Sequence, residues 1–497
     1  MNRKLLTVFA LTVWLLSAFA QNPDVKLRGL VFLDKNKNGL KDQGEKGIKG
    51  VPVSNGDTIV LSGGTGLFSI SATPGNSIFP ILPSGFRISN SPVQNARFFS
   101  VPGGQHPAQP VCFPLTKDLQ TDHFKIGAVG DLQVSDQEEV SYACQTVIPE
   151  LSDRKDLHFN IFLGDLVNER MDLLKDVSVM LSGLPRNTWT VFGNHDRDVH
   201  ATNQDSTFNA FFGATHYAFN YGKVHFIVLN NICSDGGRQY EGRLSDRQLR
   251  FIQNDLSLVP SNRLVVICQH IPLVHLKNKD QLIALLQNRK QVLALSGHTH
   301  QVSRHFPAQN VTELVAGASC GNWWLGEKDW QGIPSALMQC GSPRNYFVIE
   351  FKGAEFQFSF KGIGLDESRQ MDILVNGPDT IDHEADGLNG MEEHAVVANI
   401  YGGSDSTMVR MQVNEGRWTE MKKASLISPN VSRLIALNKI KAYPTKFSKR
   451  AALRKTPSPH IWIGNLPADL QKGIHQIKIE ASDRYGFSTS GSRLISF

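Results

Sequence analysis

The sequence has few cysteines and almost no net charge. Six cysteines are too few for a disulfide framework in a chain of 497 residues. Cys144 and Cys268 lie in apolar segments, which predicts buried thiols, whereas the sequence leaves open whether Cys320 and Cys340 pair. The 51 lysines and arginines nearly cancel the 46 aspartates and glutamates, which gives a net charge of +5. The chain as a whole therefore lacks the basic excess of nucleic-acid-binding and other polyanion-binding proteins.

Long apolar runs are also scarce, and the run at the N-terminus is too short to span a bilayer comfortably. A basic head (Arg3 and Lys4) precedes an apolar run that ends at Leu16, and an Ala-x-Ala ending follows. This order predicts a secretory signal peptide over residues 1–20, cleaved near Ala20, in preference to a membrane anchor. No cysteine follows the predicted cut, so no lipoprotein anchor is expected. We expect a secreted, periplasmic or cell-surface protein with no further membrane-spanning segment.

The chain is too long for one hydrophobic core, and the pattern of its residues changes twice. Residues 22–118 combine alternating apolar and polar positions with Gly, Ser and Asn turns, which predicts a small all-β domain. Residues 119–352 alternate apolar runs with segments of helical spacing. Residues 355–497 return to short alternating runs, which predict a β-sandwich-like domain. Three domains are therefore expected.

One loop in the first domain has the spacing of a calcium-binding loop. Side chains with oxygen atoms occupy the ligand positions of a twelve-residue segment: Asp34, Asn36, Asn38, Asp42 and Glu45. Gly39 stands where such a loop needs a tight turn. The preceding segment is predicted as a strand, so we expect a structural calcium site on a β-domain and not an EF-hand. An Asn-Gly turn with solvated acids is the alternative.

Five apolar runs in the middle domain end abruptly in polar residues. The runs stop at Asp131, Asp165, Asn194, His270 and His298. The runs predict buried strands, and the segments between them have helical spacing; one of these begins with a capping box at Ser245 and Gln248. Strands that alternate with helices predict a layered α/β domain, whose ligands bind at the carboxyl ends of the strands. The five strand ends therefore predict one site that is rich in oxygen and imidazole donors.

The order of these residues resembles that of the calcineurin-like metallophosphoesterases. The blocks are Asp131-Leu132-Gln133, Gly164-Asp165, Gly193-Asn194-His195-Asp196, His270 and Gly297-His298-Thr299-His300. Gln133 departs from the pattern, because the family usually has His there; we interpret it as a variant site and not as a dead one. Asn168 stands where purple acid phosphatases have Tyr, which argues against that branch.

The three-part order resembles secreted calcineurin-like phosphoesterases of Bacteroidetes-type bacteria. This resemblance covers nearly the full mature chain. It implies a four-layer α/β/β/α metallophosphoesterase sandwich flanked by two all-β domains.

The resemblance also implies a dinuclear metal centre. Asp165 would bridge two divalent ions. The remaining ligands would be Asp131, Gln133 and His300 at the first site and Asn194, His270 and His298 at the second. Donors without thiolate favour Mn, Fe, Zn, Ni or Mg, and an amide oxygen from Gln133 would weaken the first site.

The same resemblance assigns the chemistry. His195 would act as general acid or stabilise the transition-state charge, with Asp196 holding its ring. The two metals would activate a hydroxide for in-line attack on phosphorus.

A loop that follows these blocks has the composition of a substrate-binding wall. Asn322, Trp323, Trp324 and Arg344 combine two aromatic rings with polar groups. The tryptophans could stack on a sugar or base ring, or they could seal the contact with the C-terminal domain. Cys340 stands where the secreted branch often has Asp, so the substrate specificity of that branch is not carried over.

A basic run lies in the C-terminal domain. Seven lysines and arginines fall between Lys439 and Lys455. We interpret the run as a solvated loop, and capture of an anionic substrate or glycan is the alternative.

The sequence thus predicts a secreted metal-dependent hydrolase of phosphate monoesters or diesters, with diesters slightly favoured. Two alternatives stay open: a non-catalytic cell-surface protein that binds phosphorylated glycans through a degenerate metal site, and a calcium-stabilised adhesion protein. The sequence leaves open the natural substrate, the metal identity, the role of the β-domains and the oligomeric state.

Overall fold

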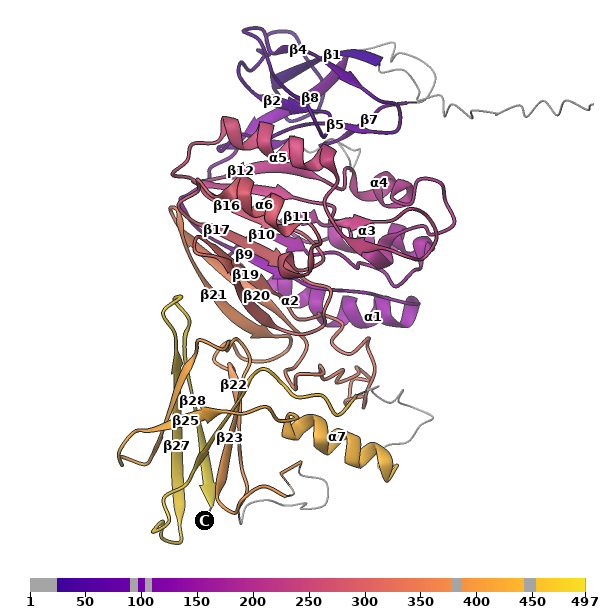
Figure 1. Ribbon diagram of the computed structural model, residues 1–497. Coiled ribbons are helices and arrows are strands. Elements are labelled where there is room, and N and C mark those ends of the chain that lie inside the picture. Colours follow the sequence, from indigo (N-terminus) through magenta and orange to yellow (C-terminus); the bar gives the residue numbers. More distant parts are fainter. Residues whose placement is uncertain are drawn as a thin grey trace, which may run out of the picture.

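The computed structural model describes residues 25–89, 97–102, 110–377, 387–388, 390–441 and 453–496. The chain forms three parts that follow one another along one long axis, from top to bottom in Figure 1. The predicted signal peptide lies outside the described residues, as do residues 442–452 of the basic run. No described helix is both long enough and apolar enough to cross a membrane.

The N-terminal part is all β, as predicted. Its two sheets have the strand orders β4-β1-β8-β6 and β3-β2-β5-β7. The strands are β1 (Val25–Leu33), β2 (Pro52–Ser54), β3 (Ile59–Leu61), β4 (Leu67–Ala72), β5 (Ser77–Pro80), β6 (Phe86–Ile88), β7 (Phe99–Ser100) and β8 (Val111–Lys117). Exposed and buried side chains alternate strictly in β4, so Phe68, Ile70 and Ala72 face the core.

The central part contains two sheets with helices on their outer faces. The first sheet has the order β11-β10-β9-β20-β21 and the second the order β12-β13-β16-β17-β19-β18. Their strands are β9 (His123–Val129), β10 (Leu157–Phe162), β11 (Asn187–Thr190), β12 (Tyr217–Tyr221), β13 (Val224–Val228), β16 (Leu264–Cys268), β17 (Val292–Ser296), β18 (Ser303–Ala308), β19 (Val311–Val315), β20 (Asn345–Lys352) and β21 (Glu355–Gly362). Two short strands, β14 (Ile232–Cys233) and β15 (Glu241–Gly242), pair with each other.

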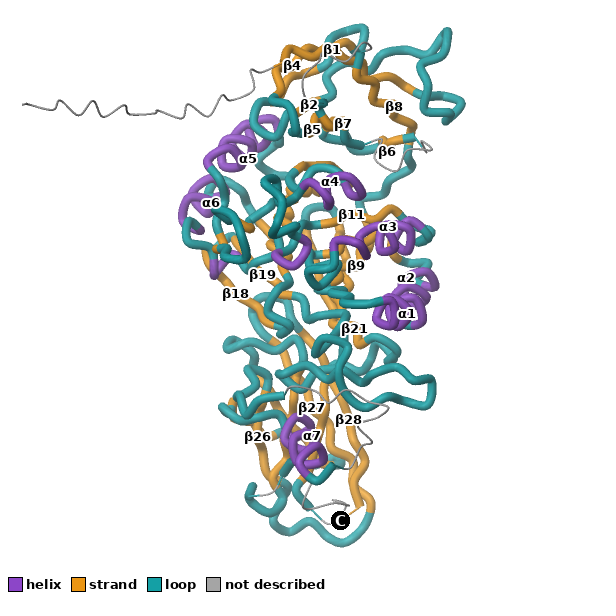
Figure 2. Tube along the Cα trace, turned by 90° about the vertical axis from the view of Figure 1, so that its right-hand side faces the viewer, coloured by secondary structure: helices purple, strands orange, loops and turns teal. Residues whose placement is uncertain are grey.

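Helices cover both sheets from outside. They are α1 (Gln137–Gln145), α2 (Val147–Asp153), α3 (Leu174–Ser182), α4 (Ser206–Phe212), α5 (Asp246–Leu258) and α6 (Lys279–Leu286), with short 3-10 turns at η1 (Met171–Leu173), η2 (Asn194–Asp196) and η3 (Leu273–His275). In Figure 2, α1 to α3 lie on one side of the sheets, and α5 and α6 lie on the other. This is the predicted α/β/β/α layering of a metallophosphoesterase.

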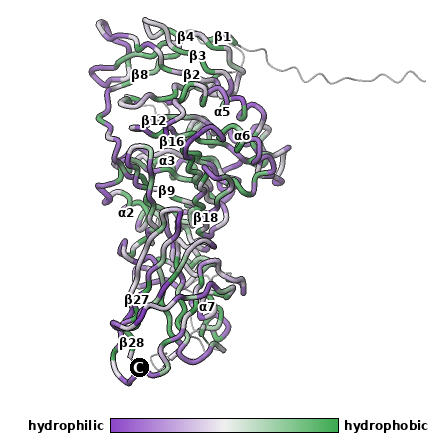
Figure 3. Tube along the Cα trace, turned by 60° about the vertical axis from the view of Figure 1, so that its left-hand side comes forward, coloured by the Kyte–Doolittle hydropathy of each residue, from purple (hydrophilic) through white to green (hydrophobic). Residues whose placement is uncertain are grey.

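The central strands are buried, as expected for strands covered on both faces. Every residue of β16 and β17 is buried, which is typical of parallel strands covered on both faces. Between the two sheets, Phe159 of β10 meets Phe226 of β13 with ring centroids 5.4 Å apart. Figure 3 shows hydrophobic residues gathered along the central strands and hydrophilic residues in the outer turns. The predicted cap of α5 is present, because Ser245 Oγ accepts the N–H of Gln248.

The C-terminal part is a seven-stranded antiparallel sheet with the order β22-β23-β26-β25-β24-β27-β28. The strands are β22 (Met371–Val375), β23 (Ala395–Ile400), β24 (Met408–Val413), β25 (Thr419–Lys423), β26 (Ile461–Asn465), β27 (Ile474–Ser482) and β28 (Ser488–Ser496). The sheet curls until its edge strands β22 and β28 contact each other, which gives the sandwich-like shape that was predicted. The helix α7 (Pro429–Lys439), which begins with a proline in its first turn, was not predicted.

The described cysteines correct one prediction. Cys268 is buried as predicted, but Cys144 is exposed, because it lies on the outer side of α1. Cys320 and Cys340 are both buried and do not form a disulfide.

Candidate metal centre

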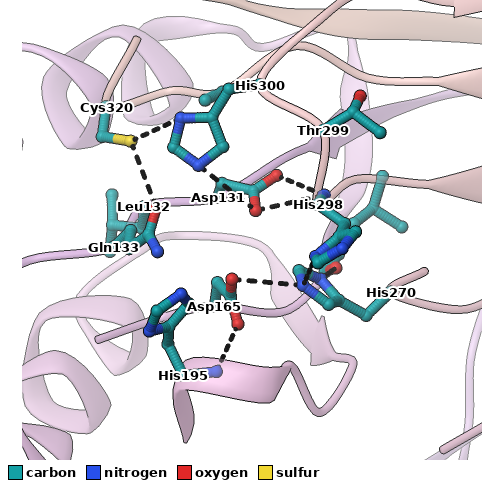
Figure 4. Close-up of polar contacts among 12 residues, drawn as sticks. Asp131, Leu132, Gln133, Asp165, His195, His270, His298, Thr299, His300 and Cys320 are labelled. Carbon is teal, nitrogen blue, oxygen red and sulfur yellow. Dashed lines mark hydrogen bonds and ion pairs between the residues drawn. The ribbon is translucent and has the colours of Figure 1, made fainter. Parts of the chain in front are cut away.

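The polar residues at the five strand ends lie together at one edge of the two central sheets. Asp131, Asp165 and Asn194 follow β9, β10 and β11 of the first sheet, while His270 and His298 follow β16 and β17 of the second. Because these strands are parallel within each sheet, their carboxyl ends share one edge. Figure 4 shows most of these side chains facing one another.

Five of the predicted ligands have left-handed backbones. The φ angles are +35° at Asp131, +42° at Gln133, +50° at Asp165, +73° at His298 and +49° at His300. Each such residue costs roughly 1–2 kcal/mol, because Cβ crowds the following carbonyl group. Strain of this kind clusters at functional sites, and here it turns the side chains abruptly out of the strands.

Two glycines of the motifs lie so close to candidate ligands that there is no room for a side chain. A Cβ atom at Gly193 would lie 2.1 Å from the backbone nitrogen of Asp165, and one at Gly297 would lie 2.6 Å from Oδ2 of Asp131. Any larger residue at either position would displace a candidate ligand.

The donors of the predicted second site are in mutual contact. Nε2 of His270 lies 3.1 Å from Oδ2 of Asp165, 3.0 Å from Oδ1 of Asn194 and 3.2 Å from Nδ1 of His298. Nδ1 of His270 contacts the carbonyl oxygen of Leu163 at 2.8 Å, which directs Nε2 into the site. Within the described residues, the ligand atoms of Asp165, His270 and His298 form a group within 4.8 Å of one another that could hold a metal.

The donors of the predicted first site are more widely spaced. Nε2 of His300 lies 3.8 Å from Oδ1 of Asp131, and Nδ1 of His300 contacts the carbonyl oxygen of Gly321 at 2.7 Å. Both carboxylate oxygens of Asp131 accept the backbone N–H of His298. The buried amide of Gln133 has its Oε1 4.0 Å from Sγ of Cys320. The first site therefore has one strong carboxylate, one oriented imidazole and one weak donor.

Burial and charge set the protonation of these groups. Burial raises the pKa of Asp131, and Asp165 adds to the effect. Burial alone would lower the pKa of His270, but the carboxylate of Asp165 outweighs it and raises that pKa to about 9. Burial lowers the pKa of His298 to about 3, with a contribution from His270, and that of His300 to about 4. The last two imidazoles are therefore neutral at pH 7, which is the form that binds metals.

His195 lies beside this cluster, but its acidic neighbour differs from the prediction. Its backbone N–H donates to Oδ1 of Asp165 at 2.8 Å, and its Nδ1 is buried and has no hydrogen-bond partner among the described residues. The carboxylate of Asp196 faces backbone instead: it accepts the N–H groups of Leu166, Val167 and Gly193 at 2.7, 3.1 and 2.9 Å. Asp196 thus links the loops that follow β10 and β11, and its carboxylate faces backbone and not the ring of His195.

The acid that faces the ring of His195 is Glu169, which the sequence did not single out. Oε1 of Glu169 lies 3.8 Å from Nδ1 of His195, and its other oxygen pairs with Arg238 at 3.0 Å. Glu169 has a φ of +57°, and its N–H donates to the carbonyl oxygen of His195 at 3.0 Å. The position of Glu169, four residues after Asp165, does not predict this contact, because the contact depends on the left-handed backbone at Glu169.

Comparison with known proteins agrees with this geometry. Residues 124–302 match the family model described as "Calcineurin-like phosphoesterase", and residues 313–488 match "C terminal of Calcineurin-like phosphoesterase". The chain carries a calcineurin-like phosphoesterase domain and its C-terminal domain. No match was found among the curated proteins.

Several solved structures are similar to the chain. One is a dimetal phosphatase from Danio rerio, at 14% identity over 48% of this chain and 96% of that one, with a TM-score of 0.35. Another is purple acid phosphatase PPD1 from yellow lupin (Lupinus luteus) seeds, at 14% identity over 69% and 64%, with a TM-score of 0.36. A third is a 5'-nucleotidase from Candida albicans, at 10% identity over 76% and 91%, with a TM-score of 0.31. None of these is similar enough to transfer a substrate.

Of the four residues predicted to form the substrate wall, one is exposed and three are buried. Trp323 is 42% exposed, and its ring stacks on His300 with centroids 4.5 Å apart. Trp324 is buried, and its Nε1 donates to the carbonyl oxygen of Leu132 at 3.0 Å. Arg344 is buried over the ring of Trp324, and Asn322 is buried with it. Only Trp323 of these four residues presents a ring to solvent beside the site.

A second aromatic residue, which the sequence did not indicate, lies near the other histidine. Tyr240 is 38% exposed, and its ring meets that of His298 edge-on at 6.3 Å. Its loop is anchored by buried Arg197, which donates to the carbonyl oxygens of Asn194 at 3.0 Å and Arg238 at 2.8 Å. The half-exposed rings of Trp323 and Tyr240 therefore contact the two histidines of the Gly-His-x-His block, one ring each.

The five residues of the predicted calcium loop turn toward one another. Asp34 accepts the backbone N–H groups of Lys37 and Gly39 at 2.7 and 2.8 Å. The side-chain amides of Asn36 and Asn38 both donate to Oδ2 of Asp42, and Glu45 accepts the N–H groups of Lys35 and Asp42. Calcium binding by this loop stays a prediction.

Proposed function

We propose that the chain is a secreted, metal-dependent phosphoesterase that hydrolyses phosphate monoesters or diesters at a dinuclear centre. The observation that carries this proposal is the convergence of seven candidate ligands from five strand ends, with His195 beside them. The matched calcineurin-like family supports the same reaction class. Secretion rests on the sequence of residues 1–20 alone.

The donor set fits two divalent ions. Asp165 would be shared between them, Asn194, His270 and His298 would hold one, and Asp131, Gln133 and His300 the other. Such a pair supplies an activated hydroxide and neutralises charge on the phosphoryl oxygens. Oxygen and imidazole donors without thiolate suit Mn, Fe, Zn, Ni or Mg.

The side chains around the ligands would contact the leaving oxygen and the substituents of the ester. His195 would donate a proton to the leaving oxygen or stabilise charge in the transition state, with Glu169 in place of Asp196 as the acid that faces its ring. Trp323 and Tyr240 would pack against substituents that carry rings or apolar groups. Two such surfaces, one beside each histidine, favour a diester, because a diester has a substituent for each.

The test is hydrolysis of p-nitrophenyl phosphate and bis-p-nitrophenyl phosphate by metal-stripped protein, with Mn, Zn, Fe, Ni, Mg or Ca added back singly. We expect activity that depends on a transition metal or Mg and that Asp165→Asn abolishes. The matched control is Asp280→Asn, an exposed carboxylate on α6, which should behave as the parent. Absence of hydrolysis of either ester with every metal would contradict the proposal for these ester classes.

A second function is favoured by one observation. The amide oxygen of Gln133 lies toward Cys320, and the donors of the first site are spread more widely than those of the second. If only the second site fills, the chain would be a cell-surface protein that binds phosphorylated glycans without turnover. Metal counting decides between the two: we expect two ions per chain for the enzyme and one for the binding protein.

A further inference from the structure

A polar pocket lies between the N-terminal part and the central part, away from the metal centre. Its volume is about 430 Å³, and Arg87 of β6, Arg97 and Arg186 all line it. Hydroxyl-bearing residues of α3 and β11 also line it, among them Ser178, Ser182 and Thr188. No aspartate or glutamate occurs among its described lining residues. Three arginines thus line one pocket whose described lining residues include no carboxylate.

Arg97 is held rigidly in this pocket. Its guanidinium lies 4.1 Å from the ring centroid of Trp189, and Nη1 donates to the carbonyl oxygen of Thr188 at 3.0 Å. Trp189 is itself fixed by stacking on Phe219 at 3.8 Å. Burial lowers the pKa of Arg97, so its charge has lost part of its hydration. A rigid, partly desolvated guanidinium binds an oxyanion with little further ordering.

The neighbouring hydroxyl groups add donors of the right kind. Oγ1 of Thr188 is buried and has no hydrogen-bond partner among the described residues. A hydroxyl beside guanidinium groups can donate to an oxyanion, and Arg binds phosphate through charge-assisted, often bidentate, hydrogen bonds.

The pocket is separate from the metal centre. Asn187 and Thr188 begin β11, whereas Asn194 follows its carboxyl end, so the two sites lie roughly 15–20 Å apart along the strand direction. Arg87 belongs to a different structural part from Thr188, so a bound anion would also link the N-terminal part to the central part.

We infer that this pocket is a second binding site, which takes the phosphate group of a small or polymeric ligand. The group would be held by Arg87, Arg97 and Arg186, with Thr188 as a further donor. The net charge of only +5 over the whole chain conceals this local excess. The inference does not depend on the hydrolytic activity, because no residue of the metal centre takes part.

The experiment is calorimetric titration of the full-length, metal-loaded chain with inorganic phosphate at constant ionic strength. The test variant is the double substitution Arg87→Gln with Arg186→Gln, which leaves the stacked Arg97 in place. The matched control is Arg28→Gln, which removes one exposed arginine of β1 in the same part of the molecule. Methyl phosphate and dimethyl phosphate are titrated in parallel, because they stand for a terminal and an internal phosphate of a polymer.

We expect the double variant to bind phosphate at this pocket at least roughly tenfold more weakly than the parent. Arg28→Gln should bind phosphate as the parent does. Any component from the metal centre is common to all three proteins. Binding of dimethyl phosphate would indicate a polymer backbone, and its absence a free or terminal phosphate. If the double variant unfolds, Arg186→Gln alone replaces it, because Arg186 is exposed. Equal phosphate affinity and stoichiometry in parent and variant would overturn the inference.

Discussion

Glu169→Gln should slow turnover while leaving the metal centre intact. The substitution keeps the size of the side chain but removes the charge that faces Nδ1 of His195 at 3.8 Å. Among the described residues the carboxylate of Glu169 pairs with His195 and Arg238, and neither is a candidate ligand, so metal content should stay at the parent value. The catalytic effect should therefore arise at the imidazole.

The magnitude follows from distance and exposure. Unit charges at this separation attract by about 1 kcal/mol in water and about 4 kcal/mol near a protein surface. The side chains of His195 and Glu169 are 30% and 38% exposed, and pairs that are this exposed are worth about 1 kcal/mol or less in stability. We expect a loss of up to about 1 kcal/mol of transition-state stabilisation, which corresponds to a kcat lower by up to roughly fivefold.

The assay compares two leaving groups. If His195 protonates the leaving oxygen, a phenyl ester needs that proton more than a p-nitrophenyl ester does, so Glu169→Gln should lower kcat more for the phenyl ester. His195→Ala should show the same pattern with a loss of about 10²–10⁴-fold and near-normal metal content. The matched control is Glu138→Gln, which removes a carboxylate of α1 that pairs with Lys328.

Two results would refute this reasoning. An equal loss on both esters together with loss of metal would mean that Glu169 supports the ligands and not the proton transfer. No change in Glu169→Gln, with the leaving-group dependence altered instead by Asp196→Asn, would restore Asp196 as the acid that orients the ring.

Three further predictions concern the metals. Gln133→His should raise the affinity of the first site about tenfold or more, measured as metal retained against a chelator; unchanged retention would mean that position 133 is not a ligand. Because the pKa of His270 is raised to about 9, metal binding at the second site must displace a proton below that pH, so the apparent affinity of that site should rise about tenfold per pH unit up to pH 9 and then level off. A flat pH dependence would show that the proton does not sit on His270. Asp34→Ala should lower the melting temperature more in calcium than in chelator, because Asp34 also accepts two backbone N–H groups when no calcium is bound, and an equal decrease in both conditions would contradict the calcium site.

The candidate ligands could be predicted from the sequence because strand ends are visible in it. An apolar run that stops at Asp131 or His270 marks both the strand and the residue at its carboxyl end, and parallel strands bring those ends to one edge. Short motifs therefore determine much of this site. The layered fold follows from the same pattern, since fully buried runs such as β16 and β17 need helices on their outer faces.

The acid beside His195 could not be predicted, because its position depends on backbone conformation. Asp196 adjoins His195 in sequence, but its carboxylate accepts hydrogen bonds from three backbone N–H groups and does not face the ring. Glu169 reaches the ring only because its φ of +57° reverses the chain, and nothing in its residue type signals that turn. Trp323 and Trp324 show the same limit: adjacent residues of one type face solvent and core, respectively.

The C-terminal part contacts the segment that leaves the metal centre after His300. Nε2 of buried His460 contacts the carbonyl oxygen of Val302 at 2.7 Å, two residues after His300. Arg304, two residues further on, is buried in an ion pair with Asp483 and donates to the carbonyl oxygen of Gly402 at 2.8 Å. Removing one partner of a buried pair costs about 3–5 kcal/mol, because the other charge is left without compensation. The strand that continues from the metal-binding loop is therefore fixed by the C-terminal part, so that part helps to determine where His300 lies.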